Sequence, residues 1–328
     1  MTPLRIVVMG TGPFAVPMFR ALVASPHPIV AVVTRPDHAP PGRRPPPNPM
    51  REAAGAAGIG ILDPEKVNEP TVVASLAALR PDLFVVCDYG QILSRDLLAV
   101  PPLGGINLHG SLLPRHRGAA PVQWAIREGD FESGVSVIHM TPALDAGNVI
   151  TARSTPVGSR ETAAELEPRL AELGAGAVLD AVERMQAAVA ATGTVAGIGI
   201  PQDAARATRA PRLAKQDGLV DWSQPAAAVE RLRRALEPWP RLATFFTRGD
   251  GVRQRLVLDD AEVTPHAAAR GAVPGTVLDT SGGRIVVACG ADTALAITRV
   301  VPEGRRSMPA ADFLRGSPLL PGAVLGSD

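Results

Sequence analysis

The feature that most constrains the fold is an alternation of short apolar runs with helical patterns over residues 1–150. Each run is strand-sized, and a helical pattern between successive runs predicts βαβ units built on a mostly parallel sheet. The expected elements are strands at 5–9, 29–33, 83–87, 105–109 and 135–139 and helices at 14–25, 48–57, 71–79 and 119–128.

Prolines interrupt this pattern between residues 35 and 48, at positions 36, 40, 41, 45, 46 and 47. Proline lacks a backbone N–H and cannot lie inside a helix or a central strand. The segment is therefore predicted to be an exposed loop, and it carries the basic pair Arg43-Arg44.

The second half of the chain has a different pattern of residue types. Residues 161–191 are rich in Ala, Leu and Glu at helical spacing, which predicts one long helix or two helices broken near Gly174 and Gly176. Small residues, Gly and Pro dominate 193–209, as in a linker. The short apolar runs that follow predict a small, mostly β domain, for which a barrel is one possible fold. The expected architecture is α/β: a Rossmann-like, mostly parallel sheet domain at 1–190, a linker at 191–209 and a β domain at 210–328.

Composition sets limits on the class of protein. The net charge of +1 gives little support to a nucleic-acid partner, although local basic clusters can still bind one. No apolar run is long enough to span a membrane, and the N-terminus lacks a signal-peptide pattern. Cys87 and Cys289 are far apart, which argues against a disulfide or zinc framework. We expect a cytoplasmic monomer.

A glycine-rich turn, Gly10-Thr-Gly12-Pro-Phe-Ala15, follows the first strand. It loosely satisfies the dinucleotide-binding pattern, but the second strand ends in Thr34-Arg35 rather than in the acidic residue that would bind the ribose. A tight strand-to-helix turn is the better interpretation, and no nicotinamide cofactor is expected.

The segment from Asn107 to Pro121 carries the clearest chemical signal. Asn107 and His109 alternate on a short strand, so their side chains point the same way at the strand end, where open α/β sheets bind ligands. An amide and an imidazole can both stabilise a developing oxyanion, and the imidazole can also carry a proton. An isolated Asn-x-His is usually structural, but Gly110, Pro114 and Gly118 impose a specific loop here.

Asp145 lies in the turn-like sequence Ala143-Leu-Asp-Ala-Gly147, and its role has two possible interpretations. It could form an Asx turn or cap a helix, or its carboxylate could lie beside His109 and stabilise the charged ring. Spacing alone leaves both open. His109 and His116 make a poor metal site because no third ligand is near, so no metal is expected.

Together these residues resemble the formyltransferases that use 10-formyltetrahydrofolate, and within them most closely the family that formylates methionyl-tRNA. The similarity extends in order over nearly the whole chain. The matching stretches are Met9–Ala15, Arg35-Pro-Asp37, Tyr89-Gly-Gln-Ile-Leu93, Asn107–Pro121, Leu144-Asp-Ala-Gly147, Val220-Asp-Trp222 and Glu237-Pro-Trp-Pro240.

The resemblance implies transfer of a formyl group from 10-formyltetrahydrofolate, bound as a substrate, to the amino group of methionyl-initiator tRNA. It implies that Asn107, His109 and Asp145 are catalytic and that Arg43 or Arg44 contacts tRNA. It also implies an oligonucleotide-binding (OB-like) barrel as the second domain. The implied folate contacts are Ser111, Leu112, Leu113, Pro114, Tyr89, Gln91, Ile92 and Leu93.

The chain departs from the family pattern in two places. Gly42-Arg43-Arg44 is followed by three prolines instead of lysines, and Asn148 stands where the family has a second Asp. The alternative function is a relative that formylates an amino-sugar nucleotide. A non-catalytic RNA-binding protein on the same fold is disfavoured by the intact Asn107, His109 and Asp145.

Overall fold

The computed structural model describes residues 2–37, 46–249 and 251–326, which divide into two compact units. The first unit contains the residues up to Pro121 together with Glu132–Pro156 and Leu166–Pro211. The second contains Val122–Phe131, Val157–Glu165 and the residues from Arg212 onward. Between residues 121 and 166 the chain therefore passes several times from one unit to the other. The domain boundaries expected from the sequence stay a prediction.

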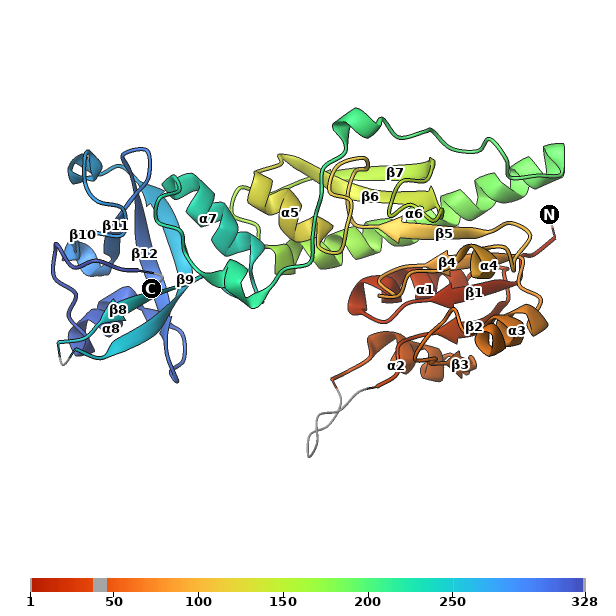
Figure 1. The fold of residues 1–328 in the computed structure, drawn as a ribbon, viewed down its shortest axis with the longest axis horizontal. Helices are drawn as coiled ribbons and strands as arrows, with labels where there is room; N and C mark the ends of the chain where they lie inside the picture. The colour runs from red at the N-terminus through yellow and green to blue at the C-terminus, as the bar shows by residue number, and fades with distance from the viewer. Residues whose placement is uncertain (1, 38–45, 250, 327–328) are drawn as a thin grey trace. The chain divides into compact units, whose positions relative to one another are not determined.

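A single sheet organises the first unit, with strand order β3-β2-β1-β4-β5-β6-β7 in the described residues (Figure 1). The ladders among β1 to β5 are parallel, and those of β5 with β6 and of β6 with β7 are antiparallel. This confirms the predicted mostly parallel sheet. The strands are β1 (Ile6–Met9), β2 (Ile29–Val33), β3 (Ile61–Leu62), β4 (Leu83–Val86), β5 (Gly105–His109), β6 (Glu132–His139) and β7 (Val149–Pro156).

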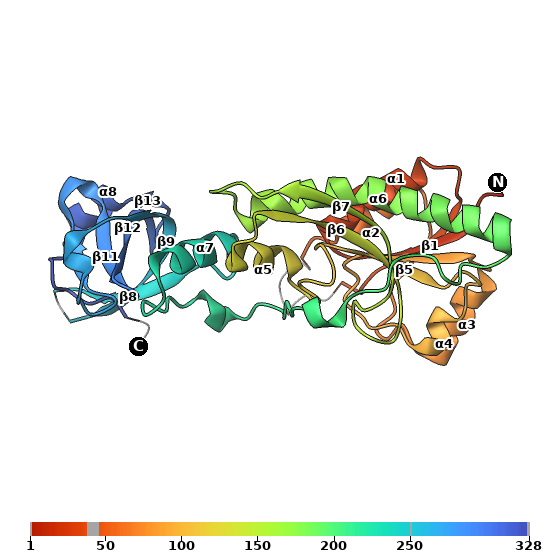
Figure 2. The same ribbon diagram turned by 90° about the horizontal axis from the view of Figure 1, so that it is seen from above.

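Helices cover both faces of this sheet, which explains why strands such as β1 and β4 are apolar throughout. Figure 2 shows α1 and α6 over one face and α3 and α4 over the other. Leu76 of α3 and Leu97 of α4 pack in one core with Phe84 and Val86 of β4. The helices are α1 (Val16–Val23), α2 (Pro49–Ala56), α3 (Pro70–Ala78), α4 (Arg95–Leu98) and α6 (Ala163–Thr192).

Local sequence explains how two of these helices are built. Asn48 caps α2 by accepting a hydrogen bond from the backbone N–H of Arg51 (3.1 Å), and Pro49 occupies the first helical position, where its missing N–H costs nothing. Helix α6 runs unbroken through Gly174 and Gly176, so the one-helix alternative is confirmed.

An antiparallel sheet forms the second unit, with order β10-β11-β12-β9-β8 and β13 paired to β12 in the described residues. Residues 322–326 lie between the two edge strands: Gly326 pairs with Phe245 of β8, and Val324 pairs with Thr276 beside β10. The chain end thus closes the sheet toward a barrel. The strands are β8 (Ala243–Thr247), β9 (Arg253–Thr264), β10 (Val277–Asp279), β11 (Ile285–Cys289), β12 (Thr293–Pro302) and β13 (Met308–Pro309).

Among its described residues the second unit contains three α-helices: α5 (Pro121–Glu128), α7 (Ala226–Ala235) and α8 (Ala310–Gly316). The guanidinium groups of α7 connect the segments of this unit that are distant in sequence. Arg231 donates to the carbonyl oxygen of Arg127 (3.2 Å), and the buried Arg234 donates to that of Glu161 (2.9 Å). The second unit is therefore assembled from three stretches of chain.

Candidate active site

The side chains of Asn107 and His109 share one face of β5, near its carboxyl end. Asn107 pairs with Val86 of β4, whose side chain belongs to the core under α3 and α4. Since paired residues of neighbouring strands point to the same side, Asn107 and His109 face away from α6. The carboxyl end of a strand in an open sheet is the usual place for a ligand.

The imidazole of His109 is buried between two oxygen atoms. Its Nε2 donates to the carbonyl oxygen of His116 (2.9 Å), and its Nδ1 lies 3.7 Å from Oδ2 of Asp145. A carbonyl oxygen only accepts hydrogen bonds, so Nε2 carries a proton, and this hydrogen bond fixes the orientation of the ring. The Nδ1–Oδ2 distance exceeds that of a hydrogen bond, which leaves Nδ1 available to a substrate oxygen.

Asp145 reaches this position through an unusual backbone conformation. Its φ of 48° lies in the left-handed region, and its Oδ2 accepts a hydrogen bond from the backbone N–H of Gly118 (2.9 Å). The carboxylate therefore lies beside His109, as the second of the two interpretations requires.

Gly118 lies in the part of the loop after β5 that contacts Ala210. Its φ is 133°, and a Cβ atom there would lie 2.4 Å from the carbonyl oxygen of Ala210. Only glycine fits such a contact, and it is the N–H of this residue that holds Asp145.

Asn107 is half-buried, and its side-chain amide has no hydrogen-bond partner among the residues that the structure describes. A half-buried amide group of this kind can donate to an oxygen atom of a ligand. The arrangement thus provides an uncommitted amide, an imidazole and a carboxylate at one strand end.

The loop that carries the predicted folate contacts Ser111 to Pro114 is tied to β6. Ser136 accepts a hydrogen bond from the N–H of Leu113 (3.0 Å) and donates to the carbonyl oxygen of Ser111 (2.8 Å). Ser111 itself is buried and donates to the carbonyl oxygen of Arg115, whereas Leu112, Leu113 and Pro114 are partly exposed. These last three can present apolar surface to a ligand.

The residues of the second predicted folate segment, Tyr89 to Leu93, differ in burial and in hydrogen bonding. The amide of Gln91 is occupied by the N–H of Val67 and the carbonyl oxygen of Pro64, and Leu93 is part of the core. Ile92 is 76% exposed. The buried Tyr89 has a hydroxyl without a hydrogen-bond partner in the described part of the chain, and burial raises its pKa to about 12, with Arg35 opposing the shift.

The glycine-rich turn after β1 is a packing feature. A Cβ on Gly12 would lie 1.8 Å from Oδ2 of Asp88, so a larger residue here would displace this side chain. Pro13 opens a short 3₁₀ helix that leads into α1. These contacts fit the strand-to-helix turn expected from sequence.

Sequence reasoning missed three residues that support the site: Arg117, Gln202 and Thr208. Thr208 accepts a hydrogen bond from the N–H of His116, and Gln202 contacts both Arg117 and the loop of Asp145. Gln202 and Thr208 lie in the segment assigned to a linker. Composition identified no function there, because these contacts join residues more than 50 positions apart.

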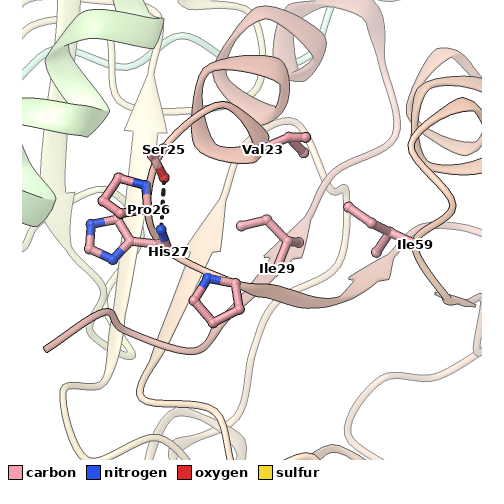
Figure 3. A pocket seen from close by; sticks show the side chains of 7 residues that line it. Val23, Ser25, Pro26, His27, Ile29 and Ile59 are labelled. Atoms are coloured by element: carbon pink, nitrogen blue, oxygen red, sulfur yellow. Dashed lines mark hydrogen bonds between the residues drawn. The ribbon is translucent and has the colours of Figure 1, made fainter.

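A pocket elsewhere in the first unit lacks this chemistry. Figure 3 shows it at the amino end of β2, lined by Val23, Ser25, Pro26, His27, Pro28, Ile29 and Ile59. His27 accepts a hydrogen bond from the N–H of Leu4 (3.0 Å), and burial lowers its pKa, partly offset by Glu183. It is a structural residue.

Three further findings limit the chemistry and topology. The described residues contain no group of three or more His, Cys, Asp or Glu side chains that could hold a metal ion. In the same residues no helix is long and apolar enough to cross a membrane. Arg43 and Arg44, the predicted tRNA contacts, lie outside the described residues.

Comparison with solved structures finds proteins of similar fold. The sugar 3N-formyl transferase WlaRD, crystallised with dTDP and 5-N-formyl-THF, superposes with a TM-score of 0.61 at 12% identity, covering 93% of this chain and all of that one. HypX from Aquifex aeolicus gives 0.58 at 18% identity over 98% of this chain and 49% of its own. At such identities these likenesses concern the fold alone.

Sequence comparison is more specific. Residues 4–182 match the family described as formyl transferase, and residues 212–318 match its C-terminal domain. The methionyl-tRNA formyltransferase of Rhodopirellula baltica is 42% identical, covering 98% of this chain and 96% of its own length. That of Roseiflexus castenholzii is 41% identical, covering 98% and 99%. The chain therefore belongs to the methionyl-tRNA formyltransferase family.

Proposed function

We propose that this enzyme transfers the formyl group of 10-formyltetrahydrofolate to the α-amino group of methionyl-initiator tRNA, and that Asn107, His109 and Asp145 carry out the transfer. The observation that supports these roles is the His109 ring, held by the His116 carbonyl at Nε2 and facing Asp145 at Nδ1. Because the substrate serves translation initiation, the reaction belongs to the cytoplasm.

The chemistry requires one bond to form and one to break. The methionyl nitrogen bonds to the formyl carbon and loses a proton, while the folate nitrogen leaves and takes one. Negative charge develops on the formyl oxygen, where the Asn107 amide and protonated His109 stabilise it. Asp145 stabilises the imidazolium and assists the transfer of the amine proton.

The residues present suit a folate with a flat ring system and an amide tail. Ile92 and Leu144 are exposed apolar side chains, and Leu112 and Leu113 are partly exposed. Among the described residues, the Asn107 amide and the buried Tyr89 hydroxyl lack hydrogen-bond partners, and a few polar groups among apolar side chains are the usual make-up of a small-molecule site. The folate contacts expected of Ser111 to Pro114 and of Tyr89 to Leu93 stay a prediction.

The relatives favour tRNA over an amino-sugar nucleotide as the acceptor. Relatives at about 40% identity over the full length are methionyl-tRNA formyltransferases, whereas the sugar formyltransferase is only 12% identical. We propose that Arg43 and Arg44 contact the tRNA backbone, where each charge pairing contributes to affinity that falls with salt.

The test offers methionyl-tRNA and an amino-sugar nucleotide separately, each with labelled 10-formyltetrahydrofolate, to the wild type and to His109→Ala. We expect label only on methionyl-tRNA, and a turnover roughly 10²–10³ lower in the variant, the usual effect of removing an oxyanion donor. Label on the sugar would reverse the acceptor assignment. Near-normal turnover by His109→Ala would remove the role proposed for the imidazole.

A further inference from the structure

Both partners of the His109 ring are held by a segment that has no role in the mechanism described so far, residues 200–210. Its ends are fixed to the first unit: Ile200 pairs with Val149, and Arg209 pairs with Arg117. Between these bridges, Gln202 reaches the loop of Asp145, and Thr208 accepts a hydrogen bond from the N–H of His116 (2.8 Å). The segment thus contacts the residues on either side of the imidazole.

Gln202 uses the full hydrogen-bonding capacity of its amide. Its Nε2 donates to the carbonyl oxygens of Asp145 (2.8 Å) and Gly147 (2.7 Å). Its Oε1 accepts from Nε (3.1 Å) and Nη2 (2.6 Å) of Arg117. A side-chain amide has two N–H donors and two lone pairs, so all four positions are filled. Such a group has one orientation and holds its neighbours in one geometry.

The two loops that Gln202 joins are those that define the environment of His109. Arg117 follows His116, whose carbonyl oxygen accepts from His109 Nε2, and it precedes Gly118, whose N–H holds the Asp145 carboxylate. Asp145 itself has a left-handed backbone, a conformation that costs free energy and needs support from its surroundings. Hydrogen bonds to the carbonyl oxygens of Asp145 and Gly147 provide that support.

We propose that Gln202 is a positioning residue for formyl transfer, which acts through Asp145 by fixing the 3.7 Å separation between its carboxylate and Nδ1 of His109. With the amide in place, Asp145 is close enough to stabilise the imidazolium but does not occupy Nδ1. Without it, the loop is free to move toward the ring or away from it, and either displacement lowers the rate. The inference rests on the roles proposed for His109 and Asp145.

Two substitutions at this position separate its donor and acceptor functions. Gln202→Ala removes both. Gln202→Glu keeps an acceptor for the Arg117 guanidinium but cannot donate to the two carbonyl oxygens, so it retains the contact that supports folding while losing the one that supports Asp145. The matched control is Gln186→Ala, since Gln186 also donates to a backbone carbonyl of the first unit, that of Thr2.

The experiment measures single-turnover rates with enzyme in excess, and KM for both substrates, in these variants and in an Asp145→Asn background. We expect Gln202→Ala and Gln202→Glu to lower the rate about 10- to 100-fold, the scale of a misplaced catalytic group, with KM nearly unchanged. Gln186→Ala should match the wild type. In the Asp145→Asn background, Gln202→Ala should cost little more, because residues that act through one another are not additive.

Full activity of both Gln202 variants beside an impaired Asp145→Asn would overturn the inference and leave the proposed function intact. Losses that multiply in the double variant would also overturn it, because Gln202 would then act independently of Asp145. An active Asp145→Asn enzyme would instead contradict the proposed role of the carboxylate itself.

Discussion

At the scale of single residues, the Asp145 carboxylate has two neighbours, the backbone N–H of Gly118 and the His109 ring, which require different properties of it. The N–H of Gly118 needs only an acceptor, whereas a protonated His109 needs a negative charge. Asp145→Asn keeps the acceptor and removes the charge, so it tests the electrostatic role separately from the structural one.

For Asp145→Asn we expect kcat to fall by roughly 10²–10³, comparable to the loss of an oxyanion donor, with a melting temperature close to that of the wild type. Asp180→Asn is the control, because Asp180 forms a partly exposed ion pair with Arg153 and such pairs contribute little. A variant with wild-type kcat would show that the charge of Asp145 is not needed.

The residues of the site differ in how far the sequence could reveal them. Asn107 and His109 were predicted to share a face because strand alternation is a local rule. Whether Asp145 reached His109 depended on how β6 and the loop after it fold, which spacing did not decide. Gln202 gave no local signal, since its partners are 55 and 57 positions away and its own segment has no periodicity.

At the scale of elements, the strongly apolar and periodic segments were predicted and the weak ones were missed. The strands at 29–33 and 105–109 have the predicted bounds. Short β3 and α4 were not predicted, nor was β7, an edge strand in which only Ile150 and Thr151 are buried. The two strands form because neighbouring strands pair with them, and this tertiary contribution is not visible in composition.

Helix α6 carries a carboxylate that opposes folding at neutral pH. Burial raises the pKa of Glu167, and the nearby charge of Asp88 raises it further. A raised pKa means that the folded state holds the proton more tightly than the unfolded chain does. Ionising Glu167 therefore removes stability as the pH rises above its ordinary value near 4.5.

We accordingly expect Glu167→Gln to raise the melting temperature at pH 8 and to have a smaller effect as the pH approaches 4, where the glutamate is protonated in both states. Thermal unfolding followed by circular dichroism across this range provides the measurement. Glu172→Gln, on the same helix, controls for a general effect of removing negative charge. A pH-independent effect at Glu167 would contradict the proposed burial penalty.

At the scale of the whole molecule, no single boundary in the sequence separates the two units. A β-rich second domain was predicted from 210 onward, and its antiparallel sheet does lie there. Yet the unit also includes Val122–Phe131 and Val157–Glu165. These two segments accept hydrogen bonds from α7 through the backbone carbonyl oxygens of Arg127 and Glu161. Every residue has a backbone carbonyl, so the sequence of these segments could not predict the contacts.

This construction leads to a prediction for a fragment of residues 210–328. Without residues 122–131 and 157–165, the guanidinium groups of Arg231 and Arg234 lose acceptors, and a face of α7 that is buried in the whole chain becomes exposed. Buried charged groups that lose hydrogen bonds destabilise the element that carries them. We expect the amides of α7 to exchange hydrogen faster in the fragment than in the full chain, as measured by mass spectrometry.

Strands β11 and β12 supply the internal control, because their ladder is complete within the fragment. Their amides should keep the protection that they have in the full chain, which also shows that the fragment folds. Equal protection of α7 in both proteins would mean that the inserted segments add nothing to its stability. Loss of protection throughout the sheet would place their contribution in the folding of the entire unit rather than in one helix, since elements that open together form a single cooperative unit.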